Sequence, residues 1–131
     1  MRLYLDTSAL VKLVVAEVES EALASYLRGF ADDVLFTAAL ARTELLRAVA
    51  DGGVTAITDA RSLLDSLDTV TLSRSLLDHA GTLPPVRLRA LDAIHLAAAQ
   101  RAGPSLRGVV TYDTRMADAA AALGMPAVGP A

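Results

Sequence analysis

Residues 3–12 read LYLDTSALVK, and this stretch decides how the chain begins its fold. The apolar run Leu3–Leu5 is typical of a short buried strand, and a second apolar stretch follows it. Between the two stands Asp6, a carboxylate at the point where the first strand ends. A charged group in this place needs a reason, and three further acids along the chain raise the same question.

Length and composition limit the class of protein. The chain has 131 residues, which suits one domain that buries about two-thirds of its unfolded surface, so we expect a single domain over residues 1–131. Because cysteine is absent, any metal must be bound by oxygen atoms or by the two histidines. No apolar run reaches the about 18 residues of a membrane span, and the start lacks the features of a signal peptide. We therefore expect a soluble, cytoplasmic protein without a membrane partner.

Segments typical of short strands alternate with helical patterns along the chain. Strands are expected at Arg2–Leu5, Val34–Thr37, Thr69–Leu72, Gly108–Tyr112 and Pro126–Val128. Helices are expected at Ser8–Val15, Ser20–Arg28, Ala38–Ala50, Val54–Leu67, Ser73–Gly81, Ala90–Ala102 and Arg115–Leu123. This alternation favours an α/β fold with three layers, α/β/α, around a central, mainly parallel sheet.

Two of the acids directly follow predicted strands. Asp6 follows the first strand, and Asp113 follows the strand GVVTY. Ligands of open parallel sheets bind beyond the carboxyl ends of the strands, so both acids are expected at the binding edge. An alternative stays open for each, because either acid can serve as the N-cap of the helix that follows it.

The other two acids lie within predicted helices. Glu44 stands beside the apolar row of its helix, where Arg47 could pair with it. Asp92 interrupts ALDAIHLAAA, a stretch that is apolar on all sides and therefore typical of a buried helix. An unpaired carboxylate is strongly unfavourable in a core, so Asp92 needs a partner, and His95 or Arg89 would serve in a purely structural pair. For His95 a ligand or base role stays open beside the commoner one, a buried histidine that orients a neighbour.

The convergence of the four acids is the strongest signal for chemistry. At a separation of about 5 Å and an effective dielectric constant of about 20, two ionised carboxylates repel by about 3 kcal/mol. Acids that gather at one edge are therefore tolerated only when they are protonated or when cations lie between them. Oxygen ligands without a majority of histidine or thiolate suit Mg²⁺ or Mn²⁺. Such a site can activate a water molecule and stabilise displacement at a phosphodiester.

Four motifs resemble those of PIN-domain ribonucleases, and closely those of VapC-type toxins of toxin–antitoxin pairs. They are LDTSALVKL (Leu5–Leu13), ARTELLRA (Ala41–Ala48), LDAIHLAAA (Leu91–Ala99) and VVTYDTRMADAA (Val109–Ala120). The resemblance covers nearly the whole chain and implies a PIN-like nuclease domain, a metal-dependent endoribonuclease that cleaves RNA with one or two Mg²⁺ or Mn²⁺ ions. It also implies a homodimer and a VapB-like antitoxin that blocks the groove.

The resemblance also implies roles for individual residues. The catalytic and metal-binding quartet that it implies consists of Asp6, Glu44, Asp92 and Asp113. Ser8 matches a small hydroxyl residue that helps to order the site, and Asp118 matches a less regular fifth acid. Apart from the roles that the resemblance implies, Thr111 is a candidate hydroxyl donor to the acids. Arg87 and Arg89 could contact phosphate or belong to a solvated loop.

The net charge of −3 gives no basic footprint for nucleic acid. Of the 15 acids, the quartet takes four, which leaves 11 against 12 basic residues and a surface close to neutral. We therefore predict modest affinity for RNA, with recognition of shape and single-stranded loops rather than of charge alone.

Three other functions compete with the nuclease as explanations of the sequence. A phosphotransferase of the haloacid-dehalogenase type has a second acid two residues after the first, where this chain has Ser8, and it needs a later lysine, whereas none follows Lys12. A receiver domain lacks the same lysine. The third rival is a catalytically inactive PIN-like module that only binds a partner such as an antitoxin. It predicts a fold indifferent to metal and no cleavage of RNA.

Overall fold

Five parallel strands form the centre of the computed structural model, which describes residues 1–131. The strands are β1 (Arg2–Leu5), β2 (Val34–Ala38), β3 (Asp68–Val70), β4 (Leu106–Val110) and β5 (Ala127–Val128). Their order in the sheet is β3-β2-β1-β4-β5, and every neighbouring pair is parallel. The expected mainly parallel sheet is confirmed.

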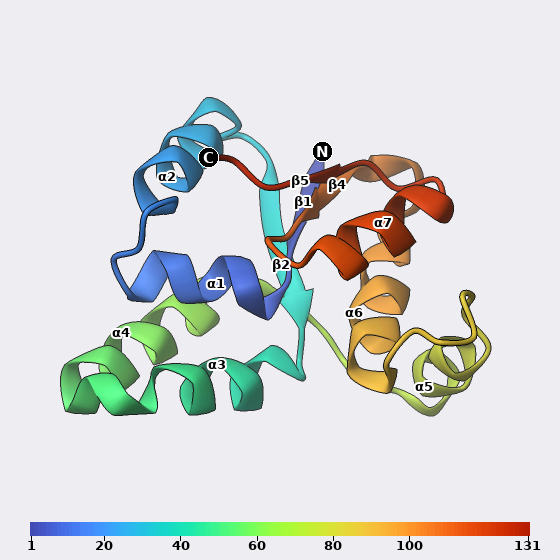
Figure 1. The fold of residues 1–131 in the computed structure, drawn as a ribbon, viewed down its shortest axis with the longest axis horizontal. Helices are drawn as coiled ribbons and strands as arrows, with labels where there is room; N and C mark the ends of the chain where they lie inside the picture. Colours follow the sequence, from blue (N-terminus) through green and yellow to red (C-terminus); the bar gives the residue numbers. More distant parts are fainter.

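Helices connect the strands and cover both faces of the sheet. They are α1 (Thr7–Val14), α2 (Ser20–Gly29), α3 (Ala41–Val49), α4 (Gly53–Ser66), α5 (Arg74–Gly81), α6 (Ala90–Gln100) and α7 (Thr114–Ala122), with short 3-10 helices at Ala50–Gly52 and Gly103–Ser105. Figure 1 shows α1–α4 on one side of the sheet and α5–α7 on the other. None of the helices combines the length and the apolar character that crossing a membrane requires.

The central strand β1 contributes to a separate core on each face, because successive side chains of a strand point to opposite sides. Leu3 and Leu5 are fully buried in the core that α1–α4 cover. Tyr4 is fully buried on the opposite face, where its ring meets that of Phe36 edge to face at 5.1 Å between centroids. The expected three-layer α/β/α fold is therefore confirmed.

Several expected boundaries are wrong by a few residues, and strand pairing accounts for the clearest cases. β2 continues to Ala38, which pairs with Val70 of β3, so α3 begins at Ala41 rather than at Ala38. β4 starts two residues earlier than expected, because Leu106 already pairs with β1. The pairing partner of a strand lies far away in sequence, and local patterns therefore do not define where the strand starts or stops.

The sheet has a switch point beside β1. From β1 the chain first builds β2 and β3 on one side and then crosses to build β4 and β5 on the other. Open parallel sheets bind ligands at such a point, beyond the carboxyl ends of the strands. Asp6 directly follows β1, and Asp113 lies beyond the end of the neighbouring strand β4. Both acids lie at this edge, as expected.

Candidate active site

Each of the four acids stands at the start of a helix. Asp6 is the N-cap of α1 and Asp113 is the N-cap of α7. Glu44 and Asp92 lie in the first turns of α3 and α6. The partial positive charge at a helix N-terminus stabilises a nearby carboxylate by roughly 0.3–1 kcal/mol. Four helix starts thus offset part of the repulsion between four gathered acids.

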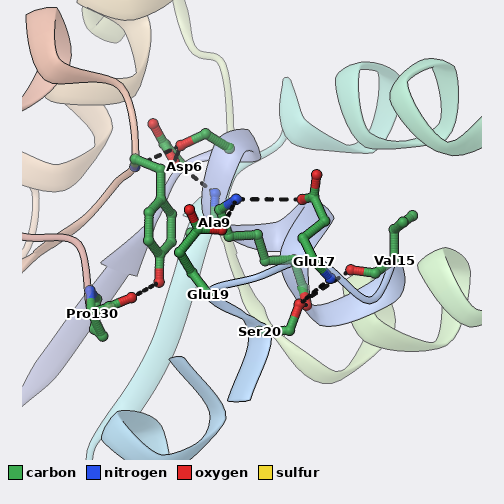
Figure 2. A network of polar contacts seen from close by, with 10 residues as sticks. Asp6, Ala9, Val15, Glu17, Glu19, Ser20 and Pro130 are labelled. Atoms are coloured by element: carbon green, nitrogen blue, oxygen red, sulfur yellow. Dashed lines mark hydrogen bonds and ion pairs between the residues drawn. The ribbon is translucent and has the colours of Figure 1, made fainter. Parts of the chain in front are cut away.

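Asp6 is deeply buried, with only 3% of the residue exposed. Its Oδ1 accepts hydrogen bonds from the Ser8 hydroxyl (2.6 Å) and the Ala9 amide (3.1 Å). Its Oδ2 accepts one from the Thr111 hydroxyl (2.5 Å). Burial raises the pKa of Asp6 above its ordinary value, and the hydrogen bonds offset only part of that rise. Figure 2 shows the carboxylate beside Ala9 at the start of α1, where these contacts fix its orientation.

Ser8 and Thr111 also join the ends of β1 and β4. The Ser8 hydroxyl accepts a hydrogen bond from the Tyr112 amide (2.9 Å), and the Thr111 hydroxyl accepts one from the Asp113 amide (3.1 Å). Each hydroxyl therefore donates to Asp6 and accepts from the segment after β4. The structure thus places both candidate hydroxyl residues against the carboxylate of Asp6.

Glu44 is the outer end of a hydrogen-bonded chain that starts in the core. The Tyr4 hydroxyl lies 2.5 Å from Nδ1 of His95, and Nε2 of His95 lies 2.6 Å from Oε1 of Glu44. The same Oε1 accepts a hydrogen bond from the Thr7 hydroxyl at 2.7 Å. His95 is 2% exposed. The prediction of a buried histidine that orients a neighbour is confirmed.

Burial and hydrogen bonding indicate which atoms of the Tyr4–His95–Glu44 series carry a proton. Burial raises the pKa of the Tyr4 phenol, so the phenol keeps its proton, and we assign it as the donor to Nδ1 of His95. Nε2 then carries the ring proton and donates to Glu44. Burial disfavours the ionised form of Glu44, but the hydrogen bonds from His95 and Thr7 outweigh it, and the pKa of Glu44 is lowered. Glu44 is therefore held as an aimed, ionised carboxylate.

Asp92 and Asp113 are held more loosely. The side chain of Asp92 is 18% exposed, and the nearest cation is Arg89, whose Nε lies 3.7 Å from Oδ2. Burial raises the pKa of Asp92, and the negative charge of Asp113 adds to the rise. Oδ1 of Asp113 accepts hydrogen bonds from the backbone amides of Arg115 (2.9 Å) and Met116 (3.3 Å). The two carboxylates thus share one region of negative potential.

The purely structural alternatives have different outcomes. The N-cap role is confirmed for both acids that follow strands. Glu44 pairs with His95, and the expected pair with Arg47 is wrong. The expectation that Asp92 lies inside the core is also wrong, since its side chain is partly exposed and His95 is bound elsewhere. Of its two expected partners, only Arg89 contacts Asp92, and only at a long distance.

Two other charged residues lie outside this arrangement. Asp118 is exposed on α7 and hydrogen-bonds to none of the other acids, although it lines a cavity together with Asp92. Lys12 pairs with Glu17 at 3.4 Å and with Glu19 at 2.8 Å (Figure 2). The single lysine of the chain is therefore engaged in ion pairs of its own.

Sequence reasoning missed two members of the hydrogen-bonded groups. Tyr4 supplies the inner end of the chain to Glu44, and a signal for it existed, because a buried tyrosine hydroxyl usually needs a polar partner. Thr7 donates to the same carboxylate. Its position next to Asp6 gave no sign of this, since the contact joins two segments that are distant in sequence.

The donor set fits a hard cation in chemistry and in charge. Four carboxylates without thiolates suit Mg²⁺ or Mn²⁺, and a cation would relieve the charge that acts on Asp92 from Asp113 and Asp6. As the side chains lie, no three acidic or histidine residues converge closely enough to enclose an ion. The residues therefore match a metal by their nature and location, and their present positions do not define a coordination geometry.

Comparisons with known proteins point in one direction. The sequence model of the PIN domain matches residues 3–122. Ribonuclease VapC46 of Mycobacterium tuberculosis is 50% identical over 128 residues, which cover 98% of this chain and 97% of that protein. Ribonuclease VapC35 of the same species is 44% identical over 133 residues, which cover 98% of this chain and 96% of that protein.

Solved structures share the fold at low sequence identity. VapC20 of Mycobacterium tuberculosis, a toxin that cleaves the sarcin–ricin loop, superposes with a TM-score of 0.72 at 17% identity and covers 98% of this chain and 99% of its own. VapBC2 of Rickettsia felis, bound to a DNA fragment from its promoter, gives a TM-score of 0.75 at 13% identity over 100% of both chains. These likenesses establish the three-layer fold of the chain and nothing further about it.

Proposed function

The chain belongs to the PIN-domain family and is a ribonuclease of the VapC type, and we propose that it cuts RNA internally with the help of Mg²⁺ or Mn²⁺, one or two ions per site. It acts in the cytoplasm as the toxin of a toxin–antitoxin pair, and residues 1–131 form one nuclease domain. The proposed catalytic and metal-binding residues are Asp6, Glu44, Asp92 and Asp113.

The observation that carries this proposal is that Asp6 and Asp113 lie beyond the ends of the neighbouring strands β1 and β4, at the switch point of the sheet, and are linked through Thr111. Asp92 has a raised pKa first because it is partly buried and then because Asp113 and, more weakly, Asp6 are negatively charged nearby. These three acids come from three different elements of the chain. A fold that only needed helix caps would have no use for mutual repulsion at this edge.

The residues of the chain divide the work of positioning. A bound divalent ion would activate a water molecule and stabilise negative charge on the phosphate. Asp6 offers a buried carboxylate that Ser8 and Thr111 hold in one orientation. Glu44 offers a carboxylate that His95 aims from the core. Side chains held in this way lose little freedom when they bind, which favours a well-ordered reacting geometry.

The decisive experiment is cleavage of total cellular RNA by the purified chain, with Mg²⁺, with Mn²⁺ and with chelator. The variant Asp6→Asn, Asp92→Asn removes two of the four proposed metal-binding carboxylates, the N-cap of α1 and the acid in the first turn of α6. The variant Asp59→Asn, Asp78→Asn removes the same charge from the exposed faces of α4 and α5 and serves as the control. We expect discrete fragments that require metal, persist in the control and disappear in the site variant.

A second measurement separates metal binding from activity. Mg²⁺ or Mn²⁺ should raise the melting temperature of the wild type and of the control variant, and leave that of the site variant unchanged. Fragments that persist with chelator, or in the site variant, would refute metal-dependent cleavage by these acids.

A second candidate function is a PIN-like module that binds an antitoxin without cleaving RNA. It is favoured by the finding that no three candidate ligands lie close enough together to hold an ion. It predicts no fragments under any condition and no effect of metal on the melting temperature.

The proposed partners are an RNA substrate, a VapB-like antitoxin and a second copy of the chain. The ribonuclease relatives support the RNA substrate, and the solved VapBC2 complex supports the antitoxin. The second copy is what the family resemblance implies. Co-expression with any short reading frame found directly beside the gene tests the antitoxin, because a true antitoxin should abolish RNA cleavage and co-purify with the chain. Light scattering after gel filtration tests the dimer.

A further inference from the structure

A cavity of about 270 Å³ opens beside Asp92, between the connection from α5 to α6 and the start of α7. Its wall carries three arginines, Arg87, Arg89 and Arg115, and one aspartate besides Asp92, namely Asp118. Figure 1 shows α6 and α7 side by side, so the arginines come from two separate segments that meet at one place. The site proposed above and this cavity share the side chain of Asp92.

The arginines of the cavity have no close ion-pair partner, in contrast to two other arginines of the chain. Arg107 forms a bidentate contact with Asp33, and Arg42 pairs with Asp65 at 2.8 Å. Arg87 and Arg115 form no ion pair, and Arg89 has only the 3.7 Å contact with Asp92. Three guanidinium groups and two carboxylates leave the cavity wall with one excess positive charge, which favours an anionic occupant. The planar guanidinium group suits phosphate oxygens, to which it can donate two hydrogen bonds at once.

We propose that this cavity is a phosphate-binding subsite, in which Arg87, Arg89 and Arg115 hold a backbone phosphate of RNA next to the phosphodiester that is cut. The inference rests on the proposed function and adds how the substrate is held. Arg89 lies three residues before Asp92, and Arg115 lies two residues after Asp113. Of the two loosely held acids, Asp92 lines the cavity itself, and Asp113 caps the helix that carries Arg115. A strand bound in the cavity therefore contacts Asp92.

The subsite also explains how a chain with a negative net charge attracts RNA. A net charge of −3 and a cluster of acids should repel RNA. Three basic side chains at the rim of the acids supply local attraction without a basic surface elsewhere. We assign the cavity to RNA and not to an acidic peptide because Asp92 is part of its wall, and an occupant is thus in contact with the proposed reaction centre.

The test measures binding of a short fluorescent single-stranded RNA at several salt concentrations, with chelator present to prevent cleavage. The variant Arg87→Gln, Arg115→Gln should bind roughly 10-fold more weakly than the wild type. The slope of log affinity against log salt should fall by up to about 0.7, the contribution of one phosphate contact on a single strand. The variant Arg87→Lys, Arg115→Lys keeps the charge and should keep most of the slope.

The matched control is Arg28→Gln, Arg61→Gln, which removes two exposed arginines from α2 and α4 on the opposite face of the sheet. It should bind RNA with the affinity and salt slope of the wild type. With metal present, the cavity variant should show a raised KM and a kcat within about twofold of the wild type, because the arginines bind a phosphate that does not react.

Each outcome decides between the alternatives. If the cavity variant binds RNA as the control does, the subsite is refuted, and cleavage by the wild type would leave the proposed function standing. If the wild type binds RNA through these arginines but never cleaves it, the proposed function fails and the subsite stands. If the cavity variant loses affinity for the co-purified antitoxin and not for RNA, the cavity is a protein-binding site and the subsite is refuted.

Discussion

The two halves of the acidic site are built differently. Asp6 and Glu44 are bound by hydroxyl, amide and imidazole groups that belong to other parts of the chain. Asp92 accepts no hydrogen bond from the protein, and Asp113 is bound at Oδ1 only by the backbone of the helix that it caps. We call the first pair the held acids and the second pair the open acids.

The two pairs of acids differ in how firmly their carboxylates are fixed before a ligand binds. The held acids are oriented before any ligand arrives, because the groups that bind them are buried or half-buried. The open acids have fewer contacts and can adjust to a ligand, and Asp92 lines the cavity described above. Changes around the held acids should therefore lower stability and activity together. Changes at the open acids should lower activity and leave the folded chain as stable as before, or more so.

The largest combined effect is expected for His95→Ala. The substitution leaves the Tyr4 hydroxyl and Oε1 of Glu44 without their buried partner and opens a cavity in the core. We expect the free energy of unfolding in urea to fall by about 2–4 kcal/mol. Cleavage should fall by roughly 10–100-fold, as for loss of a group that orients a metal ligand.

His79→Ala is the matched control for that experiment. His79 is the other histidine, and it is exposed on α5 with a hydrogen bond to Gln100. Its loss should change stability by no more than about 0.5 kcal/mol and leave cleavage unchanged. Equal losses in the two variants would mean that Glu44 is not a held acid.

Thr111→Val tests the other held acid. Valine has nearly the shape of threonine but cannot donate to Oδ2 of Asp6 or accept from the amide of Asp113. We expect a loss of about 1.5–3 kcal/mol, the range for hydrogen bonds to charged groups, together with a further rise in the pKa of Asp6 by NMR titration. Thr114→Val, on the exposed start of α7, is the control. A variant as stable as this control would show that Asp6 does not depend on Thr111.

Asp92→Asn should raise the free energy of unfolding, in contrast to the two variants above, because Asp92 is an open acid. Its pKa is raised above 3.8 on folding, so the folded state binds the proton more tightly than the unfolded chain. The stability of the metal-free protein therefore falls as the pH rises from this ordinary value through the raised one. The asparagine variant avoids that loss and should be more stable at neutral pH by on the order of 0.5 kcal/mol.

The pH dependence of unfolding checks this sign. With chelator present, the advantage of Asp92→Asn over the wild type should vanish below the ordinary pKa of 3.8, where both chains carry a neutral side chain. Asp78→Asn, on the exposed face of α5, should show no advantage at any pH. A variant that is less stable than the wild type at neutral pH would place Asp92 among the held acids.

The same comparison explains how much the sequence could predict. Each acid lies just beyond a strand or within a helix. Local sequence patterns predict such positions, and they were therefore enough to predict the fold and the candidate quartet. What holds the acids is not local. The contact of Tyr4 with His95 spans 91 positions, and that of His95 with Glu44 spans 51. Such pairs depend on how the layers pack, so sequence reasoning identified the histidine and missed the tyrosine.

The wrong expectation for Asp92 has a similar cause. A helix that is apolar on all sides predicts burial along its whole length, and α6 is indeed buried from His95 to Ala99. Its first turn, however, reaches the edge of the sheet, where Leu91 is 49% exposed and Asp92 meets the cavity. Hydrophobic pattern predicts the inside of an element better than it predicts where that element leaves the core.

The smallest effect is expected for Asp118→Asn, which tests where the open half of the site ends. Asp118 is exposed and lines the cavity among the arginines. If it is no ligand, kcat should stay within about twofold of the wild type, since exposed charges contribute little. The KM for RNA should fall by up to about twofold, because a negative charge leaves a cavity that receives phosphate. Asp59→Asn, on α4, should change neither constant. A loss in kcat on the order of 100-fold would instead make Asp118 a fifth ligand, and two held acids would then face three open ones.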